Sequence, residues 1–181
     1  QTLITNIENH KNHLSTGFVG TPYICHALSE NGAHELAATL LMKEDYPSWL
    51  YAVNMGATTI WERWNSIKPD GSFDESGMNS LNHYAYGSIG DWLYRKVAGI
   101  NQTSPGYQTL MIKPHFVKGI DEVEATLETP YGKVSSHWIC RDGKITFDIC
   151  VPSNTTAEIH LPEKQDIIKV GSGKYYYEYE T

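Results

Sequence analysis

The spacing of apolar residues changes near residue 100, and this change constrains the fold more than any other feature of the sequence. Before it, apolar residues recur at the three- and four-residue spacing of amphipathic helices. After it, short segments rich in β-branched and aromatic residues alternate with turn residues, which is typical of an antiparallel sandwich. The sequence therefore predicts the α+β fold class in two units, a helical unit at residues 1–103 and a β-sandwich at residues 104–181.

Signals for helix starts and ends divide the first unit. Helices are predicted over residues 21–30, 34–43, 47–53 and 80–97. Thr21, which precedes a proline, is the expected N-cap of the first of these helices, and Asn79 or Ser80 is the expected cap of the last. Gly87 and Gly90 lower the helix propensity of the last helix, so we expect close packing there against another helix or a ligand.

Short strands are expected in the second unit, over residues 107–112, 123–128, 132–140, 144–151, 156–161, 167–170 and 174–178. The two-residue turn Asp142-Gly143 predicts a hairpin in which Cys140 faces Ile145 and Cys150 faces Ser135. A disulfide between these two cysteines is therefore not expected. The same register places Trp138 and Phe147 on the core face.

Charge and composition exclude several classes of partner. The 181-residue chain has a formal net charge of -7 and no basic run, so no nucleic acid is expected, and no apolar run is long enough to predict a membrane partner. His10 and His13 do not complete a metal-ligand set, and neither a metal nor a cofactor is expected. The aromatic share of 12% is high, and aromatic rings suit the C–H faces of sugars.

One carboxylate lies among aromatic residues. Glu62 is flanked by Trp61 and Trp64, and Asn82-His83-Tyr84 follows after a short connection. A glycosidase needs one carboxyl to activate water or attack the anomeric carbon and a second to protonate the leaving oxygen. Glu62 suits either role, whereas the alternative is an ordinary surface glutamate. His83 suits a sugar hydroxyl or, alternatively, a packing or capping role.

A third polar set lies in the loop between these two motifs. Asp70, Asp74 and Glu75 occur in a stretch rich in Gly and Ser, and Pro69-Asp70-Gly71 predicts a turn. These carboxylates could reach the mouth of a pocket or serve only to form turns. Arg63, next to Glu62, or exposure to solvent could help to keep Glu62 ionised.

Four motifs in order resemble the C-terminal part of bacterial α-L-rhamnosidases of glycoside hydrolase family 78. The resemblance covers about residues 14–98. The motifs are Ser15-Thr16-Gly17-Phe18-Val19-Gly20-Thr21-Pro22, Tyr46-Pro47-Ser48-Trp49, Gly56-Ala57-Thr58-Thr59-Ile60-Trp61-Glu62-Arg63-Trp64 and Ser80-Leu81-Asn82-His83-Tyr84-Ala85-Tyr86-Gly87. The resemblance implies the last helices of an (α/α)6 barrel followed by a β-sandwich.

This resemblance also implies inverting hydrolysis of terminal α-L-rhamnosides, with Glu62 as general base and His83 in contact with the rhamnose. Further substrate contacts are expected from Trp49, Trp61, Trp64, Asn82 and Tyr84. The general acid of that family lies in an upstream motif that this chain does not contain. We therefore expect the chain to depend on a missing N-terminal part, to be inactive alone, and to expose apolar surface on helices 21–30 and 80–97.

Two other interpretations remain open from the residues. The first is another (α/α)6 glycosidase, acting on glucosides or uronides. The second is a non-catalytic carbohydrate-binding or structural module in which the sandwich is the working part. The resemblance implies a bacterial protein, but the sequence does not indicate a compartment.

Overall fold

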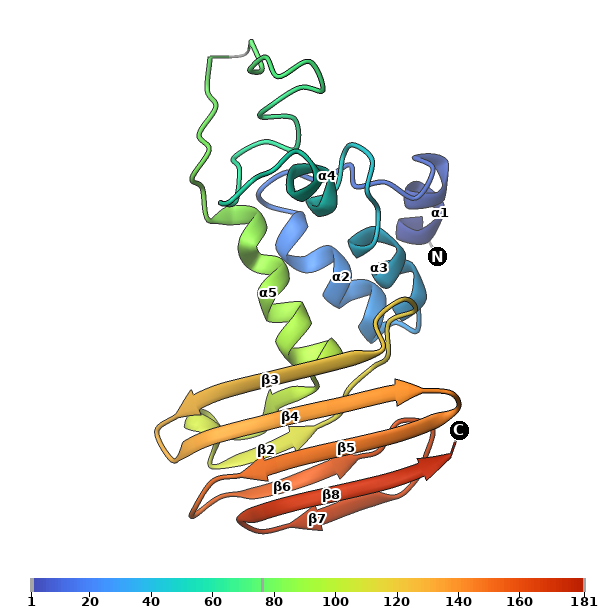
Figure 1. Ribbon diagram of the computed structural model, residues 1–181, viewed down its shortest axis with the longest axis vertical. Helices are drawn as coiled ribbons and strands as arrows, with labels where there is room; N and C mark the ends of the chain where they lie inside the picture. The colour runs from blue at the N-terminus through green and yellow to red at the C-terminus, as the bar shows by residue number, and fades with distance from the viewer. Residues whose placement is uncertain (1, 76, 181) are drawn as a thin grey trace. The chain divides into compact units, whose positions relative to one another are not determined.

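The computed structural model, described here for residues 2–75 and 77–180, consists of two compact units, Gln1–Gly90 and Asp91–Thr181 (Figure 1). The first unit contains helices and long loops, and the strands lie in the second. The change from helical to β structure is the one that the sequence pattern predicts. The domain boundary between residues 103 and 104 stays a prediction.

Four helices begin the first unit: α1 (Thr2–Asn9), α2 (Thr21–Glu30), α3 (His34–Leu41) and α4 (Trp49–Asn54). The predicted cap of α2 is wrong by one residue, since Gly20 is the N-cap and the Thr21 hydroxyl donates to the Gly17 carbonyl at 2.8 Å. Helix α4 begins at Trp49 rather than at residue 47. Its N-cap is Ser48, whose Oγ accepts a hydrogen bond from the Tyr51 N–H at 3.0 Å.

The predicted helix over residues 80–97 is wrong in its first part. The helical run consists of the 3₁₀ turn η1 (Ala85–Ser88), the α-helical turn α5 (Ile89–Trp92) and the π-helical segment η2 (Leu93–Val97). Asn79 and Ser80 do not cap it, because residues 79–83 are non-helical and bond to an earlier segment. Close packing at the two glycines is not seen against any other described residue, and packing against a ligand stays a prediction. A Cβ on Gly87 would lie at an ordinary 3.5 Å from Ile60, and one on Gly90 would meet nothing within 4 Å.

The helical unit buries a small core and leaves other apolar side chains in solvent. Ile7, Leu28 and Leu40 are buried. In contrast, Tyr23 on α2 is 70% exposed and Val19 just before it is 85% exposed. The sequence analysis expects such exposure on α2, and an apolar surface of this kind is typical of a face that another part of a protein covers.

Two four-stranded sheets form the second unit, in the orders β1-β2-β6-β7 and β3-β4-β5-β8. Figure 1 shows β2, β6 and β7 behind the second of these sheets, as in a sandwich. The strands are β1 (Ile100–Gln102), β2 (Thr109–Ile112), β3 (Glu122–Thr129), β4 (Gly132–Arg141), β5 (Lys144–Val151), β6 (Thr156–His160), β7 (Ile167–Val170) and β8 (Gly173–Glu180). The structure differs from the prediction in adding β1 and in pairing β2 with β6 in parallel.

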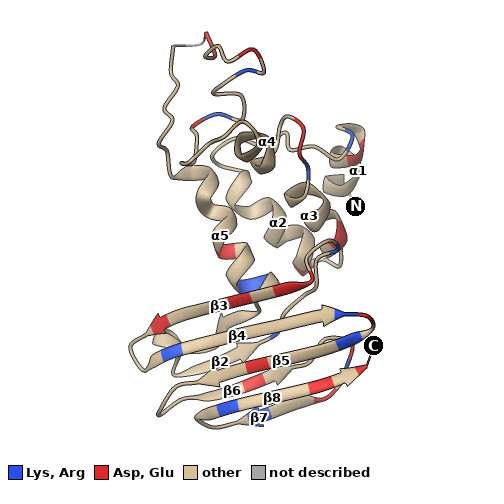
Figure 2. Cartoon of the chain, in the orientation of Figure 1, with Lys and Arg blue, Asp and Glu red and all other residues tan. Residues whose placement is uncertain are grey.

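The β4–β5 hairpin has the predicted register. Cys140 pairs with Ile145 and Cys150 with Ser135, and all three cysteines of the chain are free thiols. Trp138 and Phe147 are fully buried on the core face. Figure 2 shows the charged positions of this sheet: β3 carries acidic residues, β4 carries basic residues, and β5 and β8 carry both.

Side chains of β4 satisfy the carbonyls at the end of η2. The Trp138 indole donates to the Val97 carbonyl at 2.9 Å, and the Ser136 hydroxyl donates to the Ala98 carbonyl at 2.6 Å. The last carbonyls of a helix have no partner within the helix itself. These two bonds therefore fix the point at which the chain enters the sandwich.

Candidate active site

Two segments that are distant in sequence lie side by side and carry the predicted site residues. The His83 N–H donates to the Ile60 carbonyl at 2.8 Å, and the Glu62 N–H donates to the Ser80 carbonyl at 2.9 Å. The Thr59 hydroxyl adds a bond to the Leu81 carbonyl. The structure thus brings the Glu62 motif and the His83 motif together, as the sequence analysis expects for a common site.

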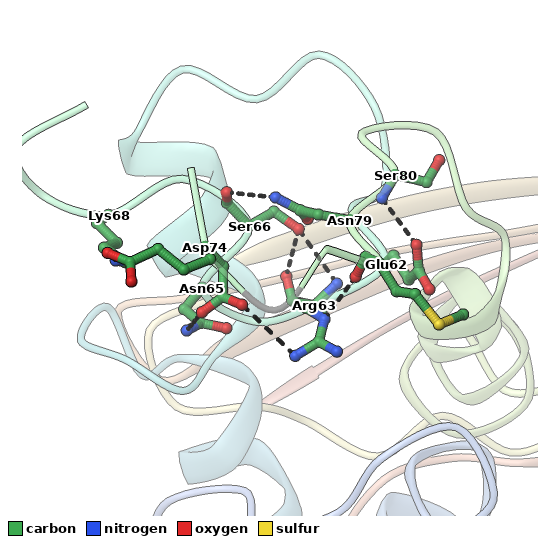
Figure 3. A network of polar contacts seen from close by, with 10 residues as sticks. Glu62, Arg63, Asn65, Ser66, Lys68, Asp74, Asn79 and Ser80 are labelled. Atoms are coloured by element: carbon green, nitrogen blue, oxygen red, sulfur yellow. Dashed lines mark hydrogen bonds and ion pairs between the residues drawn. The ribbon is translucent and has the colours of Figure 1, made fainter. Parts of the chain in front are cut away.

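The Glu62 carboxylate is held by the backbone of the neighbouring segment. The Ser80 N–H donates to Glu62 Oε2 at 2.7 Å, as Figure 3 shows. A hydrogen bond to an ionised acceptor is among the stronger ones, so it restricts the position of this half-buried carboxylate.

The three predicted tryptophans line an apolar hollow of about 400 Å³. Trp64 stacks on Tyr86 with ring centroids 3.8 Å apart, and Trp49 meets Trp64 edge to face at 5.3 Å. The Trp64 indole donates to the Thr16 carbonyl at 3.1 Å, and the Trp49 indole donates to the Tyr86 carbonyl at 2.9 Å. Because their N–H groups are bonded to the backbone, the rings have fixed orientations and offer mainly apolar surface.

Burial raises the pKa of the Tyr86 phenol, which belongs to the same hollow. The nearby Arg63 opposes this rise, whereas Tyr46 and Glu62 add to it. Tyr86 is therefore protonated near neutral pH and can act as a hydrogen-bond donor.

His83 lies between two aromatic rings. Its ring stacks on Phe18 at 4.7 Å with an interplanar angle of 11°, and on Tyr84 at 5.2 Å with an angle of 10°. The Ala85 N–H donates to His83 Nδ1 at 3.3 Å. In the neutral ring the proton is then on Nε2, which can donate to a ligand oxygen. Asn82 is exposed beside it, and Tyr84 is 88% exposed.

The hollow and the carboxylate lie next to each other but are distinct features. Trp61 is only 4% exposed and lines the hollow, whereas the residues described as lining it do not include Glu62 or His83. Ring contacts connect the hollow with His83, since Phe18 touches both His83 and Tyr86. Phe18 and Tyr86 were not among the expected site residues, although both belong to the quoted motifs.

The acidic residues of the connecting loop have three different roles. Asp70 accepts hydrogen bonds from the Ser72 N–H and hydroxyl, as expected of a turn former. Glu75 is 93% exposed and pairs with Lys68 at 3.4 Å. Asp74 instead forms an ion pair with Arg63 at 3.6 Å. Among residues 2–75 and 77–180, no group of three His, Cys, Asp or Glu could hold a metal ion, and no helix is long and apolar enough to cross a membrane.

A hydrogen-bonded carboxylate next to an aromatic hollow, on a segment that pairs with the one bearing His83, suits a glycoside hydrolase. Residues 1–97 match the bacterial alpha-L-rhamnosidase 6 hairpin glycosidase domain, and residues 99–175 match the bacterial alpha-L-rhamnosidase C-terminal domain. The chain belongs to the bacterial α-L-rhamnosidase family of glycoside hydrolases. The expected fold, helices of a six-hairpin barrel followed by a C-terminal domain, is confirmed.

Individual relatives agree with this assignment. The chain is 44% identical over 176 residues to an alpha-L-rhamnosidase of Formosa agariphila, covering 97% of this chain and 19% of the relative. It is 44% identical over 160 residues to an alpha-L-rhamnosidase of Streptomyces avermitilis, covering 88% of this chain and 16% of the relative.

Solved structures have the same fold. The Streptomyces avermitilis alpha-L-rhamnosidase complexed with L-rhamnose matches with a TM-score of 0.91 and 37% identity, over 98% of this chain and 19% of that chain. The alpha-L-rhamnosidase of Aspergillus terreus matches with a TM-score of 0.93 and 36% identity, over 97% of this chain and 20% of that chain. The chain therefore spans about a fifth of the length of these relatives.

Proposed function

We propose that the whole protein hydrolyses terminal α-L-rhamnosides with inversion at the anomeric carbon, and that Glu62 is its general base. The observation that carries this proposal is the hydrogen bond at 2.7 Å from the Ser80 N–H to the Glu62 carboxylate. Ser80 belongs to the segment that also bears His83, and this segment pairs with the one that bears Glu62. A relative with 37% identity over 98% of this chain is solved in complex with L-rhamnose. The proposed base therefore lies within a segment that rhamnose-acting relatives share.

Inversion assigns one proton transfer to each of two carboxyl groups. Glu62 removes a proton from a water molecule, whose oxygen attacks the anomeric carbon from the face opposite the leaving group. A second carboxyl protonates the departing oxygen from a position about 6.5–9.5 Å from the base, which leaves room for the water. We place this general acid in the part of the protein outside these 181 residues, which span about a fifth of the length of the relatives.

His83 and the aromatic residues supply the proposed sugar contacts. His83 Nε2 can donate to a hydroxyl, and the exposed side chains of Asn82 and Tyr84 lie next to it. Trp49, Trp61 and Trp64 offer apolar surface that suits the C–H face and the methyl group of rhamnose. A uronide carboxylate would require a cationic partner, and Arg63, which also lines the hollow, is already paired with Asp74, so these assignments suit a 6-deoxy sugar better.

A panel of aryl glycosides tests the proposed substrate and stereochemistry. The whole protein is expected to release the aryl group from an α-L-rhamnoside much faster than from a glucoside or a uronide. Proton NMR of the first product formed should show β-L-rhamnose, before mutarotation mixes the anomers. If α-L-rhamnose appears first, the reaction retains configuration and Glu62 is not the base of an inverting enzyme.

A further inference from the structure

We propose that Arg63 and Asp74 are positioning residues: together they hold residues 78–80 against residues 62–63, so that the Ser80 N–H keeps the Glu62 carboxylate in its working position. This inference rests on the proposed role of Glu62. It gives the acidic loop between the two motifs a part in the reaction without placing any of its residues on the substrate.

A short hairpin brings Asp74 back to Arg63. Its turn is Pro69-Asp70-Gly71, in which the Gly71 N–H donates to the Lys68 carbonyl at 2.8 Å. Beyond the turn, Ile67 pairs with Phe73, and the Asp74 N–H donates to the Ser66 carbonyl at 3.3 Å. The turn predicted from sequence thus brings the Asp74 carboxylate, which lies eleven residues downstream (74 − 63 = 11), back to the Arg63 side chain.

Asp74 and Arg63 then link this hairpin to the segment that holds Glu62. Asp74 Oδ2 accepts a hydrogen bond from Asn65 Nδ2 at 2.8 Å, and its Oδ1 lies 3.6 Å from Arg63 Nη1. Arg63 Nε donates to the Met78 carbonyl at 2.7 Å. Only 16% of the Asp74 side chain is exposed, so solvent screens this pair less than an ordinary surface ion pair.

A second connection runs parallel to the first. Asn79 Nδ2 donates to the Ser66 carbonyl at 2.8 Å, and the buried Ser66 hydroxyl donates to the Arg63 carbonyl at 3.2 Å. Met78 and Asn79, immediately before Ser80, are therefore both bonded to the 63–66 segment. Figure 3 shows the bond from Asn79 to Ser66. Since the Ser80 N–H carries the bond to Glu62, these connections set where that N–H points.

Its position next to Glu62 in the sequence suggests that Arg63 supports the Glu62 carboxylate electrostatically. In the structure, the guanidinium bonds instead to the Met78 carbonyl and Asp74. Its effect on Glu62 thus passes through the backbone at residues 78–80. This route gives a role to a loop carboxylate that is paired and largely buried.

The test substitutes Asp74 in the whole protein and compares it with its neighbour. Asp74→Asn and Asp74→Ala are measured beside Glu75→Gln, which removes the same charge from a side chain that is 93% exposed. Misplacement of a reacting group by about 1 Å can lower the rate about 100-fold, so we expect kcat to fall about 10-fold or more in Asp74→Ala, with little change in KM. Asp74→Asn can keep the hydrogen bond to Asn65 and should lose less.

Two further measurements separate positioning from simple destabilisation. A hydrogen bond to a carboxylate stabilises its ionised form, so loosening of the Ser80 bond should move the acidic limb of the kcat profile to higher pH. Hydrogen exchange of a peptide covering residues 77–83 should become faster while the sandwich peptides keep their rates. The Glu75→Gln control should change none of these quantities.

The outcomes distinguish this inference from the proposed function. If Glu62→Gln is slow but the Asp74 variants match the Glu75→Gln control in kcat and pH profile, the positioning role is wrong and the general base stands. The positioning role is equally wrong if the Asp74 variants lose activity with an unchanged acidic limb and faster exchange throughout the chain. If Glu62→Gln turns over like wild type, the proposed function fails and the positioning role fails with it.

Discussion

Replacement of Ser136 by alanine tests how the chain is anchored to the sandwich. Ser136 is fully buried, and its hydroxyl donates to the Ala98 carbonyl at 2.6 Å. The substitution removes one oxygen and leaves a buried carbonyl without this donor, which costs about 1–3 kcal/mol. Because about 1.4 kcal/mol corresponds to a factor of ten, amides that exchange by opening of the sandwich should exchange roughly 5- to 140-fold faster.

Hydrogen exchange of peptides from β4 and β5 measures this effect directly. The matched control is Ser135→Ala, on the same strand but on the opposite face, where Ser135 pairs with Cys150. Its effect should lie within about 0.5 kcal/mol, as is usual for surface substitutions. Equal exchange rates in both variants and wild type would refute the reasoning, since the bond to Ala98 would then contribute nothing measurable.

Three further predictions follow from the described contacts. Trp138→Ala should lower the free energy of unfolding by about 3–5 kcal/mol, whereas Tyr176→Ala, at a side chain that is 57% exposed, should change it by less than about 0.5 kcal/mol, both measured by denaturant titration. His83→Ala should lower kcat/KM by about tenfold or more on an aryl rhamnoside if its Nε2 donates to the sugar, and an unchanged kcat/KM would contradict that contact. Burial lowers the pKa of His160, and Lys113 adds to this effect while Glu158 opposes it. The folded state therefore favours the neutral ring, and the free energy of unfolding should fall as pH drops below the ordinary histidine value of 6.5. In His160→Gln the denaturation midpoint should depend less on pH over that range.

The β-sandwich was largely predictable because its signals are local. A two-residue Asp142-Gly143 turn fixes the register of β4 and β5, and the alternation of side chains then assigns Trp138 and Phe147 to the core. Strand β1 has three residues, which is too short for a period to be recognised. The parallel pairing of β2 with β6 depends on a partner 47 residues away (156 − 109 = 47), and no local signal specifies it.

The first part of the predicted 80–97 helix failed for a related reason. Apolar residues there occur at helical spacing, but the N–H groups of Ser80 and His83 bond to Glu62 Oε2 and to the Ile60 carbonyl. Hydrogen bonds to partners far away in the sequence thus override the local preference for a helix. A local sequence pattern does not contain information about such partners. The helical run begins only at Ala85, after these bonds end.

The pairing of the two segments that carry the predicted site residues agrees with the motifs, since the Glu62 and His83 segments bond to each other. The roles of Glu62, Trp61 and His83 stay predictions, and the arrangement of their side chains could not be derived from the sequence. Adjacent residues in an extended segment point to opposite sides, so Trp61 enters the hollow while Glu62 meets Ser80. The pairing of Asp74 with Arg63 depends on the geometry of the 66–74 hairpin and was left open by composition alone.

The central claim is that Glu62 activates the attacking water, and the kcat of Glu62→Gln in the whole protein tests it most directly. Glutamine keeps the size of the side chain but cannot accept the proton, and general-base catalysis contributes about 10²–10⁴-fold. The matched control is Glu75→Gln, at an exposed position. We expect kcat on an aryl α-L-rhamnoside to fall about 10²–10⁴-fold in Glu62→Gln and to stay unchanged in Glu75→Gln. Circular dichroism should show that both variants are folded. A folded Glu62→Gln enzyme with wild-type kcat would contradict the claim.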